Sequence, residues 1–327
     1  PLTHNNMKIS NHYDAIVIGG GPAGLTAGIY LSRARVNTLI LNEGTIGGQM
    51  VLTHEIANYP GVESISGYQL ATIMKKQALS FGCTISNARI KDLSLEGELK
   101  RITLHDDTVI TTHSIILSPG GRSRTLGIEG EDVLKGKGIS YCATCDGDFF
   151  TGKEIVVVGG GNSALEEAVS LTKYASKVTI VHQFDHFQAF EHAIAEVHNH
   201  PRINILMESA VTAFQGNESL ESIMIKNLRS GQTTNFSTNG VFIFIGYEPN
   251  TEFLQNKLKL NPHREIVVGP DMSTSIAGVY AAGDSIAKRY RQVTTAVGEG
   301  TVAALAASSF INELKVRQKK AVLSPVQ

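Results

Sequence analysis

The sequence predicts an α/β protein with two domains of the same βαβ design. The chain has 327 residues, which is more than one ordinary hydrophobic core and suits two domains. Its 32 glycines and 42% hydrophobic residues give the slightly glycine-rich, globular composition of α/β folds. A β-branched run that ends in glycines and precedes a helical stretch occurs twice, at residues 14–24 and 154–164. This repeat predicts two Rossmann-like (three-layer ββα) dinucleotide-binding domains.

Further elements can be assigned along the chain from apolar runs and turn residues. We expect helices over 25–35 and 165–174, strands over 38–41, 178–181, 240–246 and 278–284, a turn at 247–250 and a helix over 294–314. The remaining residues, 315–327, are polar and basic, and we expect a solvated tail.

Charge and hydropathy exclude several classes of partner. The net charge is −1 and the pI is about 7.0, so no strong field attracts nucleic acid or a membrane surface. No apolar run approaches the length needed to cross a bilayer. The first twelve residues are polar and lack a hydrophobic signal segment, so we expect a cytoplasmic protein.

The first glycine run has the G-x-G-x-x-G spacing, with Gly19, Gly21 and Gly24 between a strand and a helix. Glycines at these positions let the backbone turn sharply and approach a pyrophosphate, which then lies at the helix N-terminus. This context indicates a dinucleotide site rather than a tight turn only. A side chain near the end of the second strand should bind ribose hydroxyls. Asn42 stands there and Glu43 follows, and either can accept that hydrogen bond.

The second glycine run places Gly159, Gly161 and Ala164 at the same spacing. Alanine is tolerated at the third position, which governs how the helix packs on the strand. Binding of the 2′-phosphate of NADPH requires cations just after the next strand, yet residues 182–188 include neither Arg nor Lys. Because a hydrogen bond to a charged group contributes about 1.5–3 kcal/mol, the loss of two arginine contacts costs several hundredfold in affinity. We therefore expect NADPH to bind poorly.

The missing cations do not establish NADH as the donor, because an acidic ribose ligand is also missing. His182 occupies the position of that acid, and Asp185 is the nearest substitute. The sequence favours Asp185 as a solvated loop residue over a ribose ligand. His182 and His186 can carry partial charge below about pH 6.5, but we expect both to be solvated surface histidines.

Cys142 and Cys145 form a C-x-x-C pair followed by Asp146. Two thiols at this spacing can close a disulfide, and Asp146 offers a carboxyl group as proton donor or acceptor during thiol–disulfide exchange. A zinc site needs two further ligands, but Cys83 is isolated and no second C-x-x-C exists, so we expect no metal. A purely structural disulfide is the weaker alternative in a cysteine-poor chain.

Together these residues resemble the low-molecular-weight thioredoxin reductases. The resemblance covers residues 12–312 and rests on motifs in the family's order: Gly-Gly-Gly-Pro-Ala-Gly24, Gly47-Gly48-Gln49, Asn58-Tyr-Pro-Gly61, Cys142-Ala-Thr-Cys-Asp146, Gly-Gly-Gly-Asn-Ser-Ala164, Ala282-Gly-Asp284 and Tyr290-Arg-Gln292. The Cys-Ala-Thr-Cys-Asp signature just before the second glycine run is its most specific part. This chain differs in lacking the family's His-Arg-Arg-x-x-x-Arg motif, because His182 is followed by glutamine, phenylalanine and then Gln188.

The resemblance implies a FAD-binding domain made of residues 1–119 and 247–327, with a NAD(P)-binding-like domain, residues 120–246, inserted between them. It implies that Cys145 faces the flavin, that Cys142 exchanges with the protein substrate and that Asp146 donates protons. The FAD-binding residues it implies are Gly19, Gly21, Gly24, Asn42, Glu43, Gly48, Gln49, Asn58, Gly283, Asp284, Arg291, Gln292 and Val293. The residues implied for a nicotinamide dinucleotide are Gly159, Gly161, Asn162, Ser163 and Ala164.

The function implied is transfer of two electrons through FAD to the Cys142–Cys145 disulfide and on to thioredoxin or a similar protein, by a homodimer. The absent arginines point to NADH or reduced ferredoxin as the donor instead of NADPH. One alternative is a FAD-dependent dithiol oxidase that passes electrons to oxygen, against which the protein-disulfide form of the cysteine motif argues. Another is a flavoprotein sensor or scaffold, for which an intact cysteine pair with its acid has no use.

Overall fold

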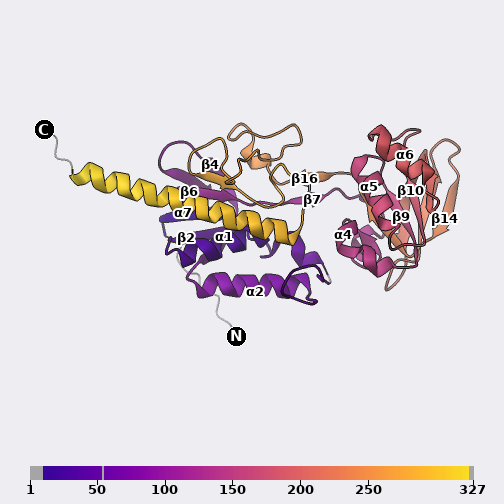
Figure 1. The fold of residues 1–327 in the computed structure, drawn as a ribbon, viewed down its shortest axis with the longest axis horizontal. Helices are drawn as coiled ribbons and strands as arrows, with labels where there is room; N and C mark the ends of the chain where they lie inside the picture. Colours follow the sequence, from indigo (N-terminus) through magenta and orange to yellow (C-terminus); the bar gives the residue numbers. More distant parts are fainter. Residues whose placement is uncertain (1–9, 54, 324–327) are drawn as a thin grey trace. The chain divides into compact units, whose positions relative to one another are not determined.

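The computed structural model describes residues 10–53 and 55–323, so the expectation for the first nine residues lies outside the described part. The chain divides into two compact units (Figure 1). Pro1–Arg122 and Glu248–Gln327 together make the first unit, and Ser123–Tyr247 make the inserted unit. None of the helices in the described chain has the length and apolar character that crossing a membrane requires.

The first unit is built on a mixed sheet with the order β3-β2-β1-β6-β5-β4, and β17 also pairs with β6. β1, β2, β3, β6 and β17 run parallel, whereas β4 and β5 add an antiparallel ribbon. The strands are β1 (His12–Ile18), β2 (Thr38–Asn42), β3 (Thr84–Asn87), β4 (Ile90–Ser94), β5 (Lys100–Leu104), β6 (Val109–Leu117) and β17 (Val279–Ala281).

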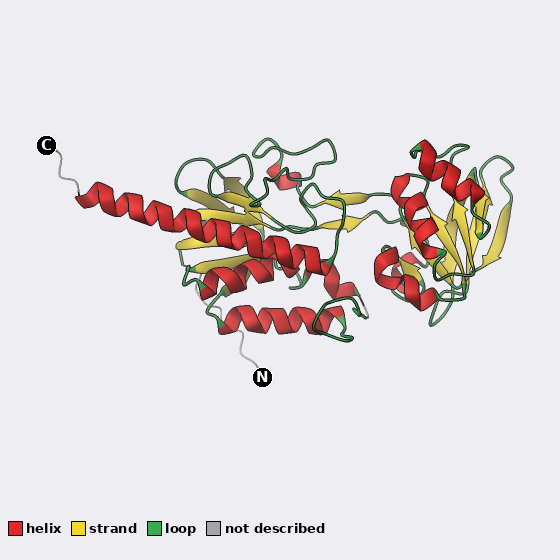
Figure 2. Ribbon diagram, viewed as in Figure 1, coloured by secondary structure: helices red, strands yellow, loops and turns green. Residues whose placement is uncertain are grey.

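Side chains of β1 point alternately to the two faces of the sheet, and both faces are apolar. Ala15 and Val17 pack with the helices α1 (Pro22–Arg33), α2 (Gly67–Ser80) and α7 (Val293–Leu323). Ile16 and Ile18 face the opposite side, which residues of β4 and β5 and of the segment before β17 cover (Figure 2). Because both faces are buried, β1 and β2 read as nearly continuous apolar runs.

The helix expected over 294–314 is longer at its C-terminal end than predicted. α7 continues to Leu323, so the expectation of a tail from residue 315 onwards was wrong for residues 315–323, and residues 324–327 lie outside the described part. Lys315 to Lys319 are exposed, as a solvated segment requires, but they are helical. Lysine, arginine and glutamine are good helix formers, and no glycine or proline interrupts the run before Pro325.

The inserted unit contains a parallel sheet with the order β11-β10-β9-β15-β8 and a separate antiparallel sheet, β12-β13-β14. Its strands are β8 (Ile139–Ser140), β9 (Glu154–Val158), β10 (Lys177–Val181), β11 (Ile203–Leu206), β12 (Ser209–Gln215), β13 (Ser222–Asn227), β14 (Thr233–Ser237) and β15 (Gly240–Ile243). Its helices are α3 (Glu131–Leu134), α4 (Ala143–Asp146), α5 (Asn162–Leu171), α6 (Glu191–Asn199) and the 3₁₀ turn η2 (Gly147–Phe150).

The chain passes between the units through two short strands, β7 (Gly121–Ser123) and β16 (Tyr247–Pro249), which pair with each other. The turn expected at 247–250 is therefore replaced by a strand, whose partner lies far away in the sequence. Two further 3₁₀ turns, η1 (Gly48–Leu52) and η3 (Glu252–Leu254), belong to the first unit. Each strand–glycine–helix repeat lies in the large sheet of its unit, with β1 in the first and β9 in the second, and the predicted fold class is confirmed.

Candidate active site

The cysteine pair lies in the inserted unit, where Cys142 and Cys145 form a disulfide. Cys142 caps the N-terminus of α4, and the backbone N–H of Cys145 donates to Cys142 Sγ over 3.2 Å. An N–H group directed at sulfur stabilises negative charge there, so this bond favours a thiolate at Cys142 once the disulfide is reduced. Both cysteines are partly exposed.

Asp146 closes α4 and is held beside the pair. Its Oδ2 accepts a hydrogen bond of 2.6 Å from the hydroxyl of Ser140, the last residue of β8. Burial raises the pKa of the Asp146 carboxyl above its ordinary value, and the charge of Asp148 acts in the same direction. The Ser140 hydrogen bond opposes both effects. A carboxyl with a raised pKa is better matched to carrying protons near neutral pH.

In the first unit, the glycine run after β1 forms the turn that the sequence predicts. Gly19 has a φ of +105°, which lies in the left-handed region, and a Cβ there would lie 2.1 Å from Ser118 O. A Cβ on Gly24 would lie 1.9 Å from Gly19 O, so only glycine allows this approach of α1 to the turn. A Cβ on Gly21, in contrast, would meet nothing nearer than Gly48 Cα at 4.0 Å.

The start of α1 is suited to an anion. Gly21 is the N-cap, no side chain bonds to the first turn, and Pro22 is the first helical residue. The first N–H groups of a helix have no partner within it, and next to the open space at Gly21 they form the cradle that a pyrophosphate needs. This part of the predicted site therefore fits FAD.

We expect a contrast between two alanine variants of this turn. Gly24→Ala lowers the free energy of unfolding by about 3 kcal/mol, because the new methyl group overlaps the backbone of Gly19. Gly21→Ala leaves the unfolding of the FAD-free protein nearly unchanged but weakens FAD binding at least about tenfold, because the methyl group enters the cradle. Urea unfolding and fluorescence titration with FAD measure the two effects. Equal FAD affinity in Gly21→Ala and the unchanged protein would contradict the assignment of the cradle.

Asn42 and Glu43, the two side chains predicted to bind ribose, make different contacts from each other. Asn42 is buried, its Oδ1 accepts from Gly20 N over 2.8 Å, and its Nδ2 donates to Gly44 O over 3.0 Å. It therefore braces the glycine turn from β2. Glu43 is exposed and lies 3.5 Å from Arg89, which leaves its carboxylate within reach of a ligand.

Two distant segments meet the glycine turn. Gly48 and Gln49 begin η1, and a Cβ on Gly48 would lie 3.3 Å from Gly21 Cα. A Cβ on Gly283 would lie 3.0 Å from the Cβ of Ala23, so the loop after β17 also lies at the start of α1. Predicted residues of 47–49 and 283–284 are thus brought to one place.

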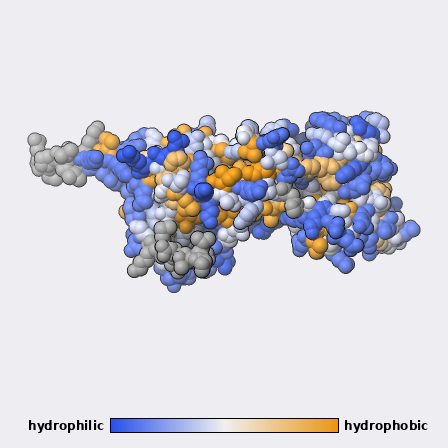
Figure 3. Space-filling model, turned by 90° about the horizontal axis from the view of Figure 1, so that it is seen from below, coloured by the Kyte–Doolittle hydropathy of each residue, from blue (hydrophilic) through white to orange (hydrophobic). Residues whose placement is uncertain are grey.

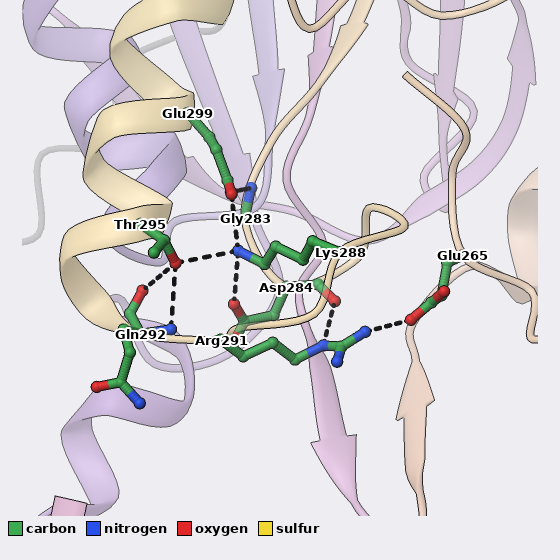
Figure 4. A network of polar contacts seen from close by, with 8 residues as sticks. All are labelled: Glu265, Gly283, Asp284, Lys288, Arg291, Gln292, Thr295 and Glu299. Carbon is green, nitrogen blue, oxygen red and sulfur yellow. Dashed lines mark hydrogen bonds and ion pairs between the residues drawn. The ribbon is translucent and has the colours of Figure 1, made fainter. Parts of the chain in front are cut away.

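That loop is organised by charged residues that the sequence analysis missed (Figure 4). Lys288 Nζ lies 3.2 Å from Asp284 Oδ1 and 2.8 Å from Glu299 Oε2, and Glu299 Oε2 also accepts from Gly283 N over 2.9 Å. Among the described residues, Asp284 Oδ1 is buried and has no hydrogen-bond partner besides this ion pair. A buried carboxylate oxygen with spare capacity fits a role in accepting a ribitol hydroxyl of FAD.

The rest of the loop positions the other predicted residues. Arg291 donates to Asp284 O over 3.3 Å and forms an ion pair with Glu265. Gln292 accepts from Asn58 Nδ2 over 3.4 Å, and Val293 begins α7. No sequence signal pointed to this network, because residues 284–288 form a loop, in which an i,i+4 spacing does not bring side chains together as it does on a helix.

Lys288→Met is expected to lower both stability and FAD affinity. The variant leaves the carboxylates of Asp284 and Glu299 without the cation between them, at a site where the lysine side chain is 11% exposed. Loss of one partner costs about 3–5 kcal/mol in a fully buried pair, and partial exposure of the two carboxylates reduces this to about 2–3 kcal/mol. Urea unfolding of the FAD-free protein measures this loss, and fluorescence titration measures the FAD affinity. Lys288→Arg keeps the charge and is the control; equal unfolding of the methionine variant and the unchanged protein would contradict this account.

In the inserted unit, the second glycine run repeats the first design. Gly159 has a φ of +143°, and a Cβ there would lie 2.4 Å from Phe244 O. Gly161 is the N-cap of α5, without a side-chain cap, and a Cβ on it would meet only Gln188 O at 3.9 Å. Ala164 is fully buried and Ser163 is exposed. The cradle for a second pyrophosphate is therefore preserved.

The loop after β10 lies at the edge of this cradle and is bonded to both sides of Gly161. Gln188 N donates to Gly160 O over 2.9 Å, and Phe190 N donates to Asn162 Oδ1 over 2.7 Å. Asn162 thus fastens the loop to the start of α5. Phe184 and Phe190 expose their rings at 45% and 62%, so the loop presents aromatic surface.

The expectation that both histidines are solvated was wrong for His182. This residue is 5% exposed, and a Cβ on Gly160 would lie 2.3 Å from its ring. Its ring packs against Phe187 and its Nε2 lies 3.0 Å from His186 O. Burial lowers the pKa of His182, so it is neutral near pH 7 and supplies no charge to a ligand. His186 is exposed and pairs with Asp185 over 2.6 Å.

One cation near this loop was missed. The hydrogen bond with His186 is the main cause that lowers the pKa of Asp185, and the charge of Arg229, which follows β13, adds to it, so Arg229 lies close to the loop. Its guanidinium is already paired with Glu208 over 3.1 Å. Glu208 N in turn donates to Phe184 O over 3.0 Å. The loop thus has a neighbouring positive charge, but one that an acid neutralises.

Comparison with known proteins agrees with this arrangement. Residues 13–300 match the family described as pyridine nucleotide-disulphide oxidoreductase. The chain is 43% identical over 306 residues to a 34.2 kDa protein in the rubredoxin operon of Clostridium pasteurianum, covering 93% of this chain and 99% of that one. It is 38% identical to the thioredoxin reductase of Bacillus subtilis, covering 94% and 98%. The crystal structure of thioredoxin reductase from Streptococcus pyogenes superimposes with a TM-score of 0.90 and 36% identity, covering 93% of this chain and all of that one. The chain is therefore a thioredoxin reductase-like, FAD-dependent disulfide oxidoreductase with two dinucleotide-binding domains, and it belongs to the pyridine nucleotide-disulphide oxidoreductase family.

Proposed function

We propose that this enzyme reduces the disulfide of thioredoxin or of a similar small protein through Cys142 and Cys145. The observation that carries the proposal is the partly exposed Cys142–Cys145 disulfide with the Asp146 carboxyl held at the end of the same short helix. FAD, when bound by the first unit, supplies a centre that accepts electrons from the donor and releases them to a disulfide.

A single proton carrier, Asp146, is enough for both halves of the thiol–disulfide exchange with the substrate. Asp146 takes the proton of the Cys142 thiol, and the thiolate attacks one substrate sulfur, forming a mixed disulfide and expelling the other substrate sulfur as a thiolate. Asp146 protonates that leaving thiolate. It then takes the proton of the Cys145 thiol, whose thiolate attacks Cys142 Sγ, re-forms the Cys142–Cys145 disulfide and expels the second substrate thiolate for protonation. Two electrons and two protons pass to the substrate.

The donor we propose is NADH or reduced ferredoxin, not NADPH. The loop after β10 supplies no cation for a 2′-phosphate, His182 is buried with a lowered pKa, and the nearby Arg229 is paired with Glu208. The open cradle at Gly161 supports NADH. The relative that is named for its place in a rubredoxin operon supports a small iron protein as donor.

Anaerobic titration of the flavin tests the donor. The oxidised holoenzyme is mixed with NADPH, NADH or reduced ferredoxin in separate cuvettes, and loss of the visible flavin band is followed. We expect rapid bleaching by NADH or by ferredoxin and slow bleaching by NADPH. Equally prompt bleaching by NADPH would refute the proposal about the donor. Oxygen consumption with a dithiol, if as fast as thioredoxin reduction, would instead favour the dithiol oxidase.

We further propose a homodimer, as the family resemblance implies. The first unit gathers apolar residues on the side that Figure 3 shows. On α2, Tyr68, Ile73 and Leu79 are exposed at 64%, 53% and 42%. Light scattering after size-exclusion chromatography measures the mass in solution, and a monomer across the micromolar range would contradict the proposal.

A further inference from the structure

Ser140 touches both parts of the redox centre with one hydroxyl group. Its Oγ donates to Asp146 Oδ2 over 2.6 Å and accepts from the backbone N–H of Cys142 over 3.1 Å. The carbonyl oxygen of Cys142 lies farther away, at 3.3 Å. A hydroxyl has one proton to donate, and the shorter distance and the charge of the carboxylate assign that proton to Asp146.

The backbone of Ser140 is held by the sheet. Ser140 pairs with Phe242 and Ile139 pairs with Val241 in the parallel ladder between β8 and β15. Ser140 is 4% exposed, and Ile139 and Phe242 belong to the cores on either side of this sheet. The hydroxyl therefore projects from a rigid strand, whereas Asp146 ends a helix of one turn. A side chain fixed by packing can hold a more mobile neighbour in a defined orientation.

We propose that Ser140 is a positioning residue of the disulfide-exchange reaction, which holds the Asp146 carboxyl beside the cysteine pair and stabilises its ionised form. This inference rests on the proposed function of Asp146 as the proton carrier. Ser140 does not touch the reacting sulfur atoms; it acts through the carboxyl and through the peptide N–H of Cys142.

The hydroxyl can hold Asp146 in both protonation states. It donates to the carboxylate, and after rotation it accepts from the carboxylic acid, because a hydroxyl oxygen has two lone pairs and only one is used by Cys142 N–H. The carboxyl can thus give and take a proton in each half of the exchange without losing its anchor. Asp146 needs no reorientation between the two proton transfers.

The groups around Asp146 determine in which direction its pKa changes when the Ser140 hydroxyl is removed. Burial raises the pKa of Asp146, and Asp148 raises it further, while the Ser140 hydrogen bond lowers it. Other titratable groups on the elements packed around it are Cys142, Cys145, Tyr174 near Gly147, and Glu166 and Glu167 on α5. Removing the hydroxyl leaves the two raising effects unopposed, so the pKa of Asp146 must increase.

The experiment compares Ser140→Ala with the unchanged holoenzyme. The pKa of Asp146 is read from its carboxyl band in infrared difference spectra, which Asp146→Asn identifies by removing it. We expect the pKa to rise by about one unit in Ser140→Ala, the size of one hydrogen bond to a charged group. The low-pH limb of disulfide exchange should shift upward by the same amount. That limb is measured in single turnovers of the chemically reduced protein with a small aromatic disulfide whose thiolate product is coloured.

Two variants serve as controls. Ser140→Thr keeps the hydroxyl and should restore both the pKa and the pH profile. Ser209→Ala removes another buried serine of the same unit, whose hydroxyl bonds to Met207 O over 2.8 Å, and should change neither.

The outcomes separate this inference from the proposed function. An unchanged Asp146 pKa in Ser140→Ala, or a shift that Ser140→Thr does not reverse, overturns the role of Ser140. A raised pKa with an unaltered pH profile supports Ser140 as the anchor of Asp146 but refutes Asp146 as the proton carrier.

Discussion

Serine variants of Cys142 and of Cys145 are each expected to lose thioredoxin reduction by about a thousandfold or more, and the double variant is expected to lose no more than either alone. The two sulfurs form one disulfide and act as a unit, so removing one atom removes the function of both. FAD content and reduction by the donor should persist, because the residues assigned to FAD lie in the first unit. Steady-state turnover measures the loss, and anaerobic flavin spectra measure what persists.

Cys83→Ser is the matched control for these variants. Cys83 is the remaining cysteine of three, lies in the core of the first unit, and burial raises the pKa of its thiol to about 11. A thiol with that pKa is almost entirely protonated near pH 7 and is a poor nucleophile. Cys83→Ser should therefore keep full turnover and lose only about 1–2 kcal/mol of stability from burying a hydroxyl. More than a tenth of normal turnover in Cys142→Ser or Cys145→Ser would show that electrons take another route.

The features that the sequence predicted well are those set by local covalent geometry. Gly19 and Gly159 adopt φ values of +105° and +143°, which strongly favour glycine. Gly24 and Ala164 lie where a helix crosses close to a strand, and larger side chains do not fit there. Such constraints act within a few residues, so a pattern of glycines between an apolar strand and a helix is enough to locate both turns.

The residues that the sequence missed or misjudged are set by contacts between distant segments. His182 looked like a loop histidine, but the absence of a side chain on Gly160 makes room for its ring beneath the second glycine turn. Arg229 approaches the same loop only because the β13–β14 hairpin folds back to it. Glu299 reaches Gly283 N from α7, across a loop whose path no local pattern specifies.

The same distinction, between local constraints and contacts of distant segments, applies to the hydrogen bonds of Asn42. Its position at the end of β2 was predicted correctly, and its Oδ1 accepts from the backbone N–H of Gly20, a contact that the sequence did not indicate. A buried N–H must be satisfied, and an asparagine in place of an acid can accept that bond while donating to Gly44 O. Sequence position indicates which side chains are near the glycine turn, and the hydrogen-bond balance decides what they bind.

Restoring the missing cations should turn the enzyme toward NADPH. The variant Gln183→Arg, Phe184→Arg and Gln188→Arg is expected to bind NADPH at least about a hundredfold more tightly than the unchanged protein. Two charge-assisted hydrogen bonds of about 1.5–3 kcal/mol each supply this gain. All three positions are exposed, so the new side chains require no repacking of the core. Stopped-flow bleaching of the flavin by NADPH, over a range of concentrations, measures the affinity.

The gain in affinity should be specific to the 2′-phosphate of NADPH. That specificity distinguishes binding of the phosphate by the loop from a general attraction of anions to the added charge. NADH lacks the phosphate, so its apparent affinity should change by less than about threefold, whereas the NADPH gain should decrease as salt screens the arginine charges. Gln183→Ala, Phe184→Ala and Gln188→Ala remove the same side chains without adding charge and should leave NADPH weak. If NADPH and NADH gain equally in the arginine variant, the charges act at long range and the loop is not the phosphate site. If neither gains, the nucleotide does not use the cradle at Gly161, and the donor must reach the flavin by a route that needs no dinucleotide.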